Sequence, residues 1–278
     1  MRSMTEDSVF VYDRTWDGLL TAVFDAFYRH QFPVAIIGEK DTPPLFAVVH
    51  RVTTDEEKAG RVFWALQRKL STSALACLTT SLFSELPDLD LPLFRYVCKA
   101  VKAGQSIETN FADPDVLFVT NTYRKVRYER LRMMQFVRFQ KTADGTYFAM
   151  IEPDYDVLPL IVPHFSDRFL EECWLIYDRR RRYGYYYAGH KSVRVTFEDG
   201  AEVFRLPDGR LSEAMRDEDE MWYQEMWRTY FKAICIKERL NPRKHRKDMP
   251  VRLLEVSDRK ANWGTRKIRG ERGHVLLF

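Results

Sequence analysis

Three short segments of the chain concentrate the side chains that bind phosphate groups. Residues 124–141 hold seven Lys and Arg against one acidic residue, residues 179–194 hold six against none, and residues 228–247 hold eight against one. Clustered cations neutralise the phosphates of a nucleic acid and release condensed counterions, so this pattern predicts DNA binding. The cations predicted to contact DNA are Arg124, Lys125, Arg132, Arg138, Arg180, Arg181, Arg182, Lys191, Arg228, Lys232, Arg239, Arg243 and Lys244.

Tyrosines alternate along the second of these segments. On a strand, Tyr183, Tyr185 and Tyr187 share one face, because side chains alternate between the two faces. Flat rings beside cations are the side chains on which the bases of a single strand stack. The alternative is that this face packs against the core while the neighbouring arginines occupy a turn.

The third segment overlaps a helix predicted over residues 217–239. Its first turn is acidic, its end is basic and Asn241-Pro242 follows it, as the helix dipole and proline geometry favour. Arg228, Lys232 and Arg239 fall within about 40° of one another around this helix. This basic edge suits contact with a DNA backbone, and a merely solvated face is the alternative.

A separate candidate site depends on one arginine at an apolar position. In the helix predicted over residues 114–134, Arg130 projects into the same arc as the apolar stripe. A buried arginine needs a carboxylate partner, and we predict an ion pair with Glu152 or Asp154. Together with His164 these residues form a candidate catalytic cluster, for which a purely structural salt bridge is the alternative.

Familiar active-site motifs are missing from the sequence. It contains no P-loop, no dinucleotide-binding glycine motif and no nucleophile elbow, and its six histidines lack the spacing of a local metal site. We therefore expect no metal and no cofactor. The four cysteines are far apart, which fits reduced thiols, and no apolar segment suits secretion or a membrane span. These features predict a cytoplasmic protein without a membrane partner.

The net charge of +4 conceals an uneven distribution along the 278 residues. Residues 1–120 contain 12 Lys and Arg against 16 Asp and Glu, whereas residues 121–278 contain 32 against 24. The positive excess predicts a polyanionic partner for the C-terminal half, although basic faces are often only solvated.

Apolar periodicity predicts the elements that position these side chains. After a short strand at residues 9–12, helical spacing dominates up to about residue 134, and from residue 136 the period changes to two. The expected fold is α+β, with a helical N-terminal half, an antiparallel sheet and a long C-terminal helix. The expected divisions are a helical subdomain (1–134), a sheet-and-helix subdomain (135–250) and a basic irregular tail (251–278).

An ordered series of motifs extends over residues 9–250. It includes Tyr12-Asp13-x-Thr15-x-x-Gly18, Ile151-Glu152-Pro153-Asp154, His164-Phe165-x-x-Arg168-Phe169, Trp174-x-Ile176-Tyr177-Asp178-x-x-Arg181 and Trp227-Arg228-x-Tyr230-Phe231-Lys232. The series resembles a bacterial family called "probable DNA metabolism protein". In other chains that domain is fused to a uracil-DNA glycosylase-superfamily domain, and its genes usually neighbour a putative DNA repair radical SAM protein.

The resemblance and the clustered charge lead to one main hypothesis. The resemblance implies a DNA-repair setting by association and not by a demonstrated reaction. We expect a DNA-binding accessory protein of a repair or base-modification system, working with a radical SAM or glycosylase partner. The alternatives are a hydrolase or nuclease acting on DNA or nucleotides, and a protein-docking module with no DNA affinity of its own.

Overall fold

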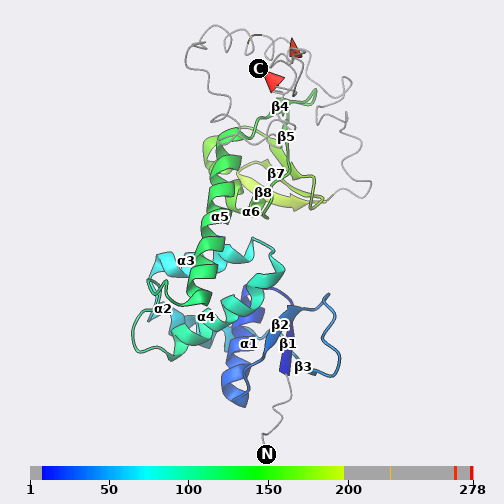
Figure 1. Cartoon of the computed structure of the whole chain (residues 1–278). Coiled ribbons are helices and arrows are strands. Elements are labelled where there is room, and N and C mark those ends of the chain that lie inside the picture. The colour runs from blue at the N-terminus through cyan, green and yellow to red at the C-terminus, as the bar shows by residue number, and fades with distance from the viewer. Residues whose placement is uncertain (1–7, 197–225, 227–265, 268–275, 278) are drawn as a thin grey trace, which may run out of the picture. The chain divides into compact units, whose positions relative to one another are not determined.

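The computed structural model describes residues 8–196, residue 226 and the short segments 266–267 and 276–277 (Figure 1). The chain divides into two compact units, residues 1–128 (unit 1) and residues 129–278 (unit 2). The predicted helix over residues 217–239, apart from residue 226, and most of the predicted tail lie outside the described residues. Within the described tail, β9 (Arg266–Lys267) pairs antiparallel with β10 (Leu276–Leu277).

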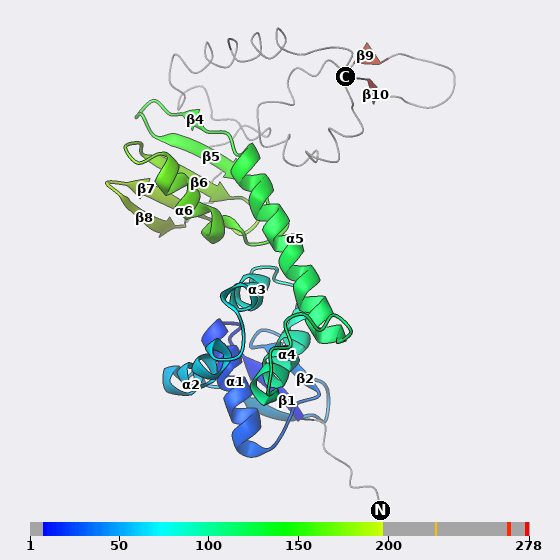
Figure 2. The same ribbon diagram turned by 90° about the vertical axis from the view of Figure 1, so that its left-hand side faces the viewer.

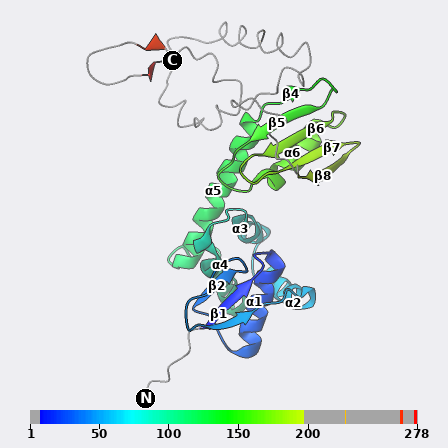
Figure 3. The ribbon, with the colours of Figure 1, turned by 90° about the vertical axis from the view of Figure 1, so that its right-hand side faces the viewer.

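Unit 1 contains a three-stranded parallel sheet. Its strands are β1 (Ser8–Tyr12), β2 (Ala35–Gly38) and β3 (Val48–Arg51), in the order β2-β1-β3. Helix α1 (Trp16–Arg29) connects β1 to β2, as a parallel pair requires, and Figure 3 shows these two strands beside it. All five residues of the central strand β1 are buried.

Helices make up most of the rest of unit 1, as the periodicity predicts. They are α2 (Glu56–Gln67), α3 (Thr72–Leu82), the short 3-10 helix η1 (Pro87–Leu89), α4 (Asp90–Lys102) and the beginning of α5 (Pro114–Phe136). Thr15, Asp55 and Ser71 cap α1, α2 and α3, each accepting a hydrogen bond from a backbone N–H of the first turn. Phe10 from the sheet and Phe94 from α4 belong to one apolar core.

Helix α5 begins as the sequence predicts. Asp113 Oδ1 accepts the backbone N–H groups of Asp115 at 2.9 Å and Val116 at 3.3 Å, and Pro114 occupies the first turn. Lys99 Nζ lies 2.5 Å from Asp113 Oδ2 and 2.7 Å from Asp115 Oδ2. The carboxylate at position 113 therefore combines a helix cap with an ion pair to α4.

Unit 2 contains a five-stranded mixed sheet (Figure 2). Its strands are β4 (Gln140–Lys141), β5 (Tyr147–Ile151), β6 (Trp174–Asp178), β7 (Tyr183–Ala188) and β8 (Lys191–Val195), in sequence order. The β4–β5, β6–β7 and β7–β8 pairs are antiparallel, as expected. The β5–β6 pair is parallel, because a crossover containing α6 (Leu158–Arg168) joins the two strands.

Aromatic packing holds α6 to this sheet. The Phe165 ring of α6 lies 6.3 Å from the Trp174 ring of β6, and both rings also contact Phe139. Trp174 stacks in turn on Tyr187 of β7, at 5.1 Å between ring centroids. The fold is thus α+β with a mainly helical N-terminal half. Among the described residues, no helix combines the length and apolar character needed to cross a membrane.

Replacing Asp113 with Ala tests the α5 cap. Burial alone raises the pKa of Asp113. The hydrogen bonds from Lys99 and from the backbone N–H groups outweigh this effect and lower the pKa below 3.8. Because the folded-state pKa is lowered, the group stabilises the fold above its unfolded pKa, and this contribution disappears as the pH falls through the folded-state value. We expect Asp113→Ala to lower the free energy of unfolding by about 1 kcal/mol at pH 7, measured by urea denaturation.

The same measurement at pH 3 and at pH 2 gives a progressively smaller difference between the wild type and the variant. Asp113→Asn is the matched control, because the amide keeps the cap and removes the charge, so its effect at pH 7 is smaller. A difference that is equally large at pH 7 and at pH 2 contradicts the assignment.

Candidate functional site

The predicted DNA-binding cations are mostly exposed where the structure describes them. The exposed ones are Arg124, Lys125, Arg138, Arg180, Arg182 and Lys191, and the half-buried ones are Arg132 and Arg181. Arg124 and Lys125 belong to unit 1, and the others belong to unit 2. The remaining predicted cations, Arg228, Lys232, Arg239, Arg243 and Lys244, lie outside the described residues.

Arg181 has a structural role at the turn between β6 and β7. Its guanidinium forms an ion pair with the fully buried Asp178 at 2.9 Å and donates to the carbonyl oxygens of Pro153 and Asp154. Asp178 also accepts the backbone N–H groups of Arg180 and Arg181. Burial raises the pKa of Asp178, although these donors oppose the shift. Arg181 is therefore held at a buried carboxylate, and its neighbours on both sides are exposed.

The alternating tyrosines lie on one face of the sheet, as their spacing predicts, because they pair with alternate residues of β6. Tyr183 is only 3% exposed and Tyr187 only 2%, whereas Tyr185 is half-buried. The Tyr183 hydroxyl donates to Asp156. The predicted base-stacking role is therefore wrong for Tyr183 and Tyr187, because their rings belong to the protein core and have no face open to a nucleotide.

The predicted buried ion pair of Arg130 is also wrong. Arg130 is exposed and forms no ion pair in the described part of the chain. The preceding residue, Glu129, is only 3% exposed and accepts the backbone N–H of Asp154 at 3.0 Å. Positions 129 and 130 both adjoin the stripe formed by Val126 and Met133. The helix buries Glu129, because its carboxylate accepts a backbone N–H, and leaves Arg130 exposed.

The four residues of the candidate catalytic cluster do not form a common site through hydrogen bonds. Glu152 and Asp154 are exposed, and His164 is half-buried with its ring 5.2 Å from that of Phe165. Among the described residues, neither Arg130, Glu152 nor His164 makes a hydrogen bond or an ion pair with another member of the cluster. The arrangement therefore lacks the contacts by which a nucleophile or a general base is activated.

A polar site that the sequence did not predict lies at the carboxyl ends of the unit 1 strands. Asp13, after β1, accepts the Thr15 backbone N–H at 2.9 Å and the Thr15 hydroxyl at 2.7 Å on one oxygen, and the Thr54 hydroxyl at 2.8 Å on the other. Burial alone raises the pKa of Asp13, but these hydrogen bonds lower it overall. Asp13 is thus an ionised carboxylate that ties the loop after β1 to the loop after β3.

A buried carboxylate organises the neighbouring part of this site. Asp90, at the start of α4, accepts the Tyr12 hydroxyl at 2.9 Å and the Arg14 guanidinium at 3.0 and 3.1 Å. Arg14 also contacts Asp41 at 2.7 Å, and Asp41 accepts the backbone N–H of Gly38. Burial raises the pKa of Asp90 despite these donors. The network joins the ends of β1 and β2 to α4.

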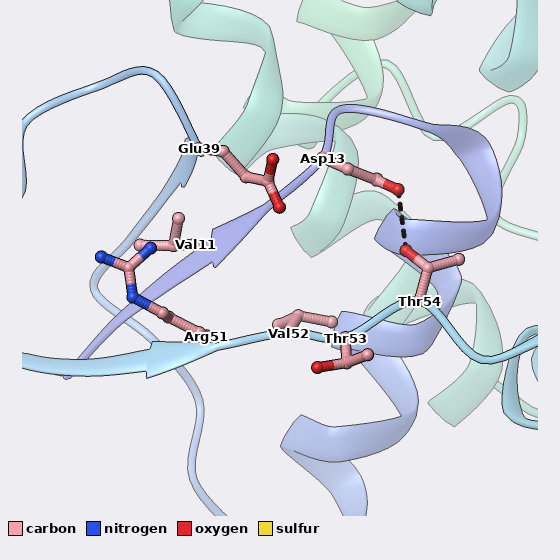
Figure 4. Close-up of a pocket in the computed structure, with 7 residues that line it drawn as sticks. All are labelled: Val11, Asp13, Glu39, Arg51, Val52, Thr53 and Thr54. Atoms are coloured by element: carbon pink, nitrogen blue, oxygen red, sulfur yellow. Dashed lines mark hydrogen bonds between the residues drawn. The ribbon is translucent and has the colours of Figure 1, made fainter.

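A pocket of about 390 Å³ opens beside Asp13 and Thr54 (Figure 4). Its lining is Val11, Asp13, Glu39, Arg51, Val52, Thr53 and Thr54. In parallel sheets, ligands bind at the carboxyl ends of the strands, at the point where the strand order reverses. In the order β2-β1-β3 this point lies between β1 and β3. The lining offers two carboxylates, one guanidinium and two hydroxyls, which suits a small polar molecule. Among the described residues, no histidine or lysine lines the pocket to activate a threonine hydroxyl.

One sequence signal marks this site. The motif Tyr12-Asp13-x-Thr15-x-x-Gly18 contains the turn-forming aspartate, the helix cap and a glycine with no room for a side chain, since a Cβ there would lie 2.1 Å from Asp13 Oδ1. The other carboxylates of the network, at positions 41 and 90, have no local signal, because they approach Arg14 only through the fold.

The fold and these sites define an α+β protein with a polar site at the ends of a parallel sheet in unit 1 and with exposed arginines beside a mixed sheet in unit 2. A family model described as a domain of unknown function, DUF4130, matches residues 87–256. The chain belongs to the DUF4130 family, because this match covers more than half of its length. No curated protein and no solved structure matches the chain.

Replacing Gly18 with Ala tests the packing around Asp13. The added methyl group meets a carboxylate whose hydrogen bonds fix its position, so the loop or the start of α1 must move. We expect Gly18→Ala to lower the free energy of unfolding by about 1–3 kcal/mol, measured by urea denaturation. Gly60→Ala, in α2, is the matched control, because a Cβ there meets nothing within 4 Å. The control stabilises the fold by about 0.5–1 kcal/mol, and a shift of the same sign in both variants contradicts the prediction.

Adjacent substitutions on α5 test which side chain is buried. Glu129→Ala removes the acceptor of the Asp154 backbone N–H, and we expect the free energy of unfolding to fall by about 1–3 kcal/mol. Arg130→Ala removes only an exposed side chain, and its effect stays within about 0.5 kcal/mol. Thermal and urea denaturation compare the two variants, and a larger effect at position 130 would show that the arginine is the residue in the buried stripe.

Proposed function

We propose that the protein is a DNA-binding accessory component of a DNA repair or base-modification system. The observation that carries the proposal is the turn between β6 and β7, where Arg179, Arg180 and Arg182 are exposed. Strand β8, at the edge of the sheet as far as the structure describes it, adds the exposed Lys191 and Arg194, and residues 179–196 contain no acidic side chain. Several cations on one short connection and its neighbouring strand provide the phosphate contacts that backbone recognition uses.

The turn holds its cations in a fixed position, which favours a binding role. Arg181 anchors the turn to Asp178, and the Arg180 guanidinium donates to the backbone carbonyl of Asp154 at 3.1 Å. A guanidinium placed in advance loses less conformational freedom when it meets a phosphate than a fully mobile one does. Edge strands also carry Lys and Arg to prevent aggregation, and this simpler role predicts no DNA affinity.

The proposed partner is a radical SAM repair protein or a uracil-DNA glycosylase-superfamily protein, on the resemblance of the motif series. The chain supplies the DNA contacts in this proposal, and the partner supplies the chemistry. The alternative of a hydrolase or nuclease lacks the ion pair predicted for its site, since Arg130 is exposed and unpaired within the described residues. The alternative of a docking module differs from the proposal in predicting no DNA binding.

Fluorescence anisotropy with labelled 20-nucleotide single strands and 20-base-pair duplexes, over a series of salt concentrations, tests the proposal. We expect the affinity to fall steeply with salt, and the double variant Arg180→Ala/Arg182→Ala to reduce the logarithmic salt slope by about 2, or about 1 for each arginine that binds a phosphate. The matched control is Lys40→Ala/Arg68→Ala, which removes the same charge from exposed positions of unit 1 and leaves the slope unchanged. Absence of binding at low salt, or equal effects of the two double variants, shows that this turn does not bind DNA.

A further inference from the structure

Aromatic rings and cations gather on the surface around the C-terminal half of α1. We call this surface the α1 platform; it consists of Phe24, Phe27, Tyr28, Phe32, Lys58, Arg61 and Lys102. Phe24 and Tyr28 stack nearly in parallel, with interplanar angle 14° and centroids 6.1 Å apart. Phe27 and Phe32 meet edge to face at 5.3 Å. The rings thus form two contacting pairs, one on α1 and one that joins α1 to the residues that follow it.

Cations from two other helices lie over these rings. From α2, the Arg61 guanidinium lies 5.0 Å and Lys58 Nζ 5.8 Å from the Phe24 ring centroid. From α4, Lys102 Nζ lies 4.0 Å from the Phe32 centroid and 5.3 Å from that of Phe27. Helix α1 lies beside both α2 and α4 (Figure 2), so each pair of rings has cations from a neighbouring helix against it.

The platform remains open to solvent despite its size. Tyr28 is 77% exposed and Phe32 is 43% exposed, although aromatic side chains are usually buried. Arg61 and Lys102 are exposed and form no ion pair with any residue that the structure describes, whereas Lys58 pairs with Asp25. Interactions between cations and rings stabilise the fold a little, but they do not account for leaving rings exposed.

We propose that the α1 platform binds single-stranded DNA, with bases stacked on Tyr28 and Phe32 and phosphates held by Arg61 and Lys102. Flat exposed rings bordered by unpaired cations are the combination that single strands use, because each nucleotide brings one ring and one negative charge. A duplex keeps its bases stacked on one another and offers no free face. The inference extends the proposed DNA binding by naming the form of DNA, but it depends on different residues in a different unit.

The full chain is titrated with a labelled thymidine 20-mer, the corresponding uridine 20-mer, a 20-base-pair duplex and poly-glutamate. We expect the thymidine strand to bind most tightly, and Tyr28→Ala to weaken that binding at least about fivefold, the lower end of base–aromatic stacking. Tyr28→Phe keeps the ring and retains the affinity. Phe46→Ala is the matched control, because Phe46 is an exposed aromatic residue of the same unit with no cation over its ring in the described part of the chain.

Several results would overturn the assignment. If Tyr28→Ala binds the thymidine strand as tightly as the wild type, bases do not stack on Tyr28. A preference for the duplex or the uridine strand shows that single-stranded DNA is not the ligand. Equal binding of poly-glutamate identifies an acidic protein as the occupant. Photocrosslinking with 5-iodouracil in the strand gives a direct readout, with the adduct expected on Tyr28 or Phe32 and an adduct elsewhere counting against the platform.

The variants separate this inference from the proposed function. If Arg180→Ala/Arg182→Ala weakens binding of both single strands and duplexes while Tyr28→Ala has no effect, the proposed function stands and the α1 platform fails. If Tyr28→Ala weakens only single-strand binding and the arginine variant has no effect, the platform stands and the turn of unit 2 fails. Circular dichroism melting curves confirm that each variant is folded.

Discussion

A buried carboxylate must be matched by donors, and in each unit this requirement fixes the local structure. Asp90 and Asp178 are almost or fully inaccessible to solvent, and each is paired with an arginine from a loop next to a strand. Removing one partner leaves an uncompensated charge in the interior, which costs several kcal/mol, so the loop conformation follows from the pair. In unit 1 the paired Arg14 adopts a left-handed backbone conformation, with φ of 57°, which is uncommon for a residue other than glycine. In unit 2 the pair holds Arg181 inward, so the neighbouring arginines lie outside the core.

The local elements were predictable because their signals are local. Caps at Thr15 and Asp113 and the change of period after Phe136 each depend on residues within one or two turns. The parallel pairing of β5 with β6 was not expected, since alternation specifies a strand but not the direction of its neighbour. The periodicity of apolar residues also could not predict which side chain, Glu129 or Arg130, is buried. Both lie close to the apolar stripe, and only the position of the Asp154 backbone decides between them.

The predicted site shows the same division between local and long-range information. The alternating pattern correctly predicted that the tyrosines of β7 share one face. It did not predict that α6 covers this face, because that depends on the side of the sheet on which the chain crosses from β5 to β6. The Asp90 network brings together residues up to 78 positions apart in the chain. The α1 platform draws its cations from α2 and α4, so no sequence window shows them together with the rings of α1.

Net charge is a poor guide to the surface of unit 1, because many of its acidic groups are committed to internal ion pairs. Residues 1–120 carry a negative excess, yet Asp25 forms an ion pair with Lys58 and a hydrogen bond with His50, and Asp113 and Asp115 share Lys99. A carboxylate neutralised at close range contributes little to the potential at a surface more than a Debye length away, about 8 Å at physiological ionic strength. Exposed cations that have no ion pair among the described residues, such as Arg61 and Lys102 of the α1 platform, then contribute a positive local field, even where the segment as a whole is acidic. The surface potential that attracts a polyanion therefore depends on the charged side chains that have no ion pair, and the fold determines which side chains these are.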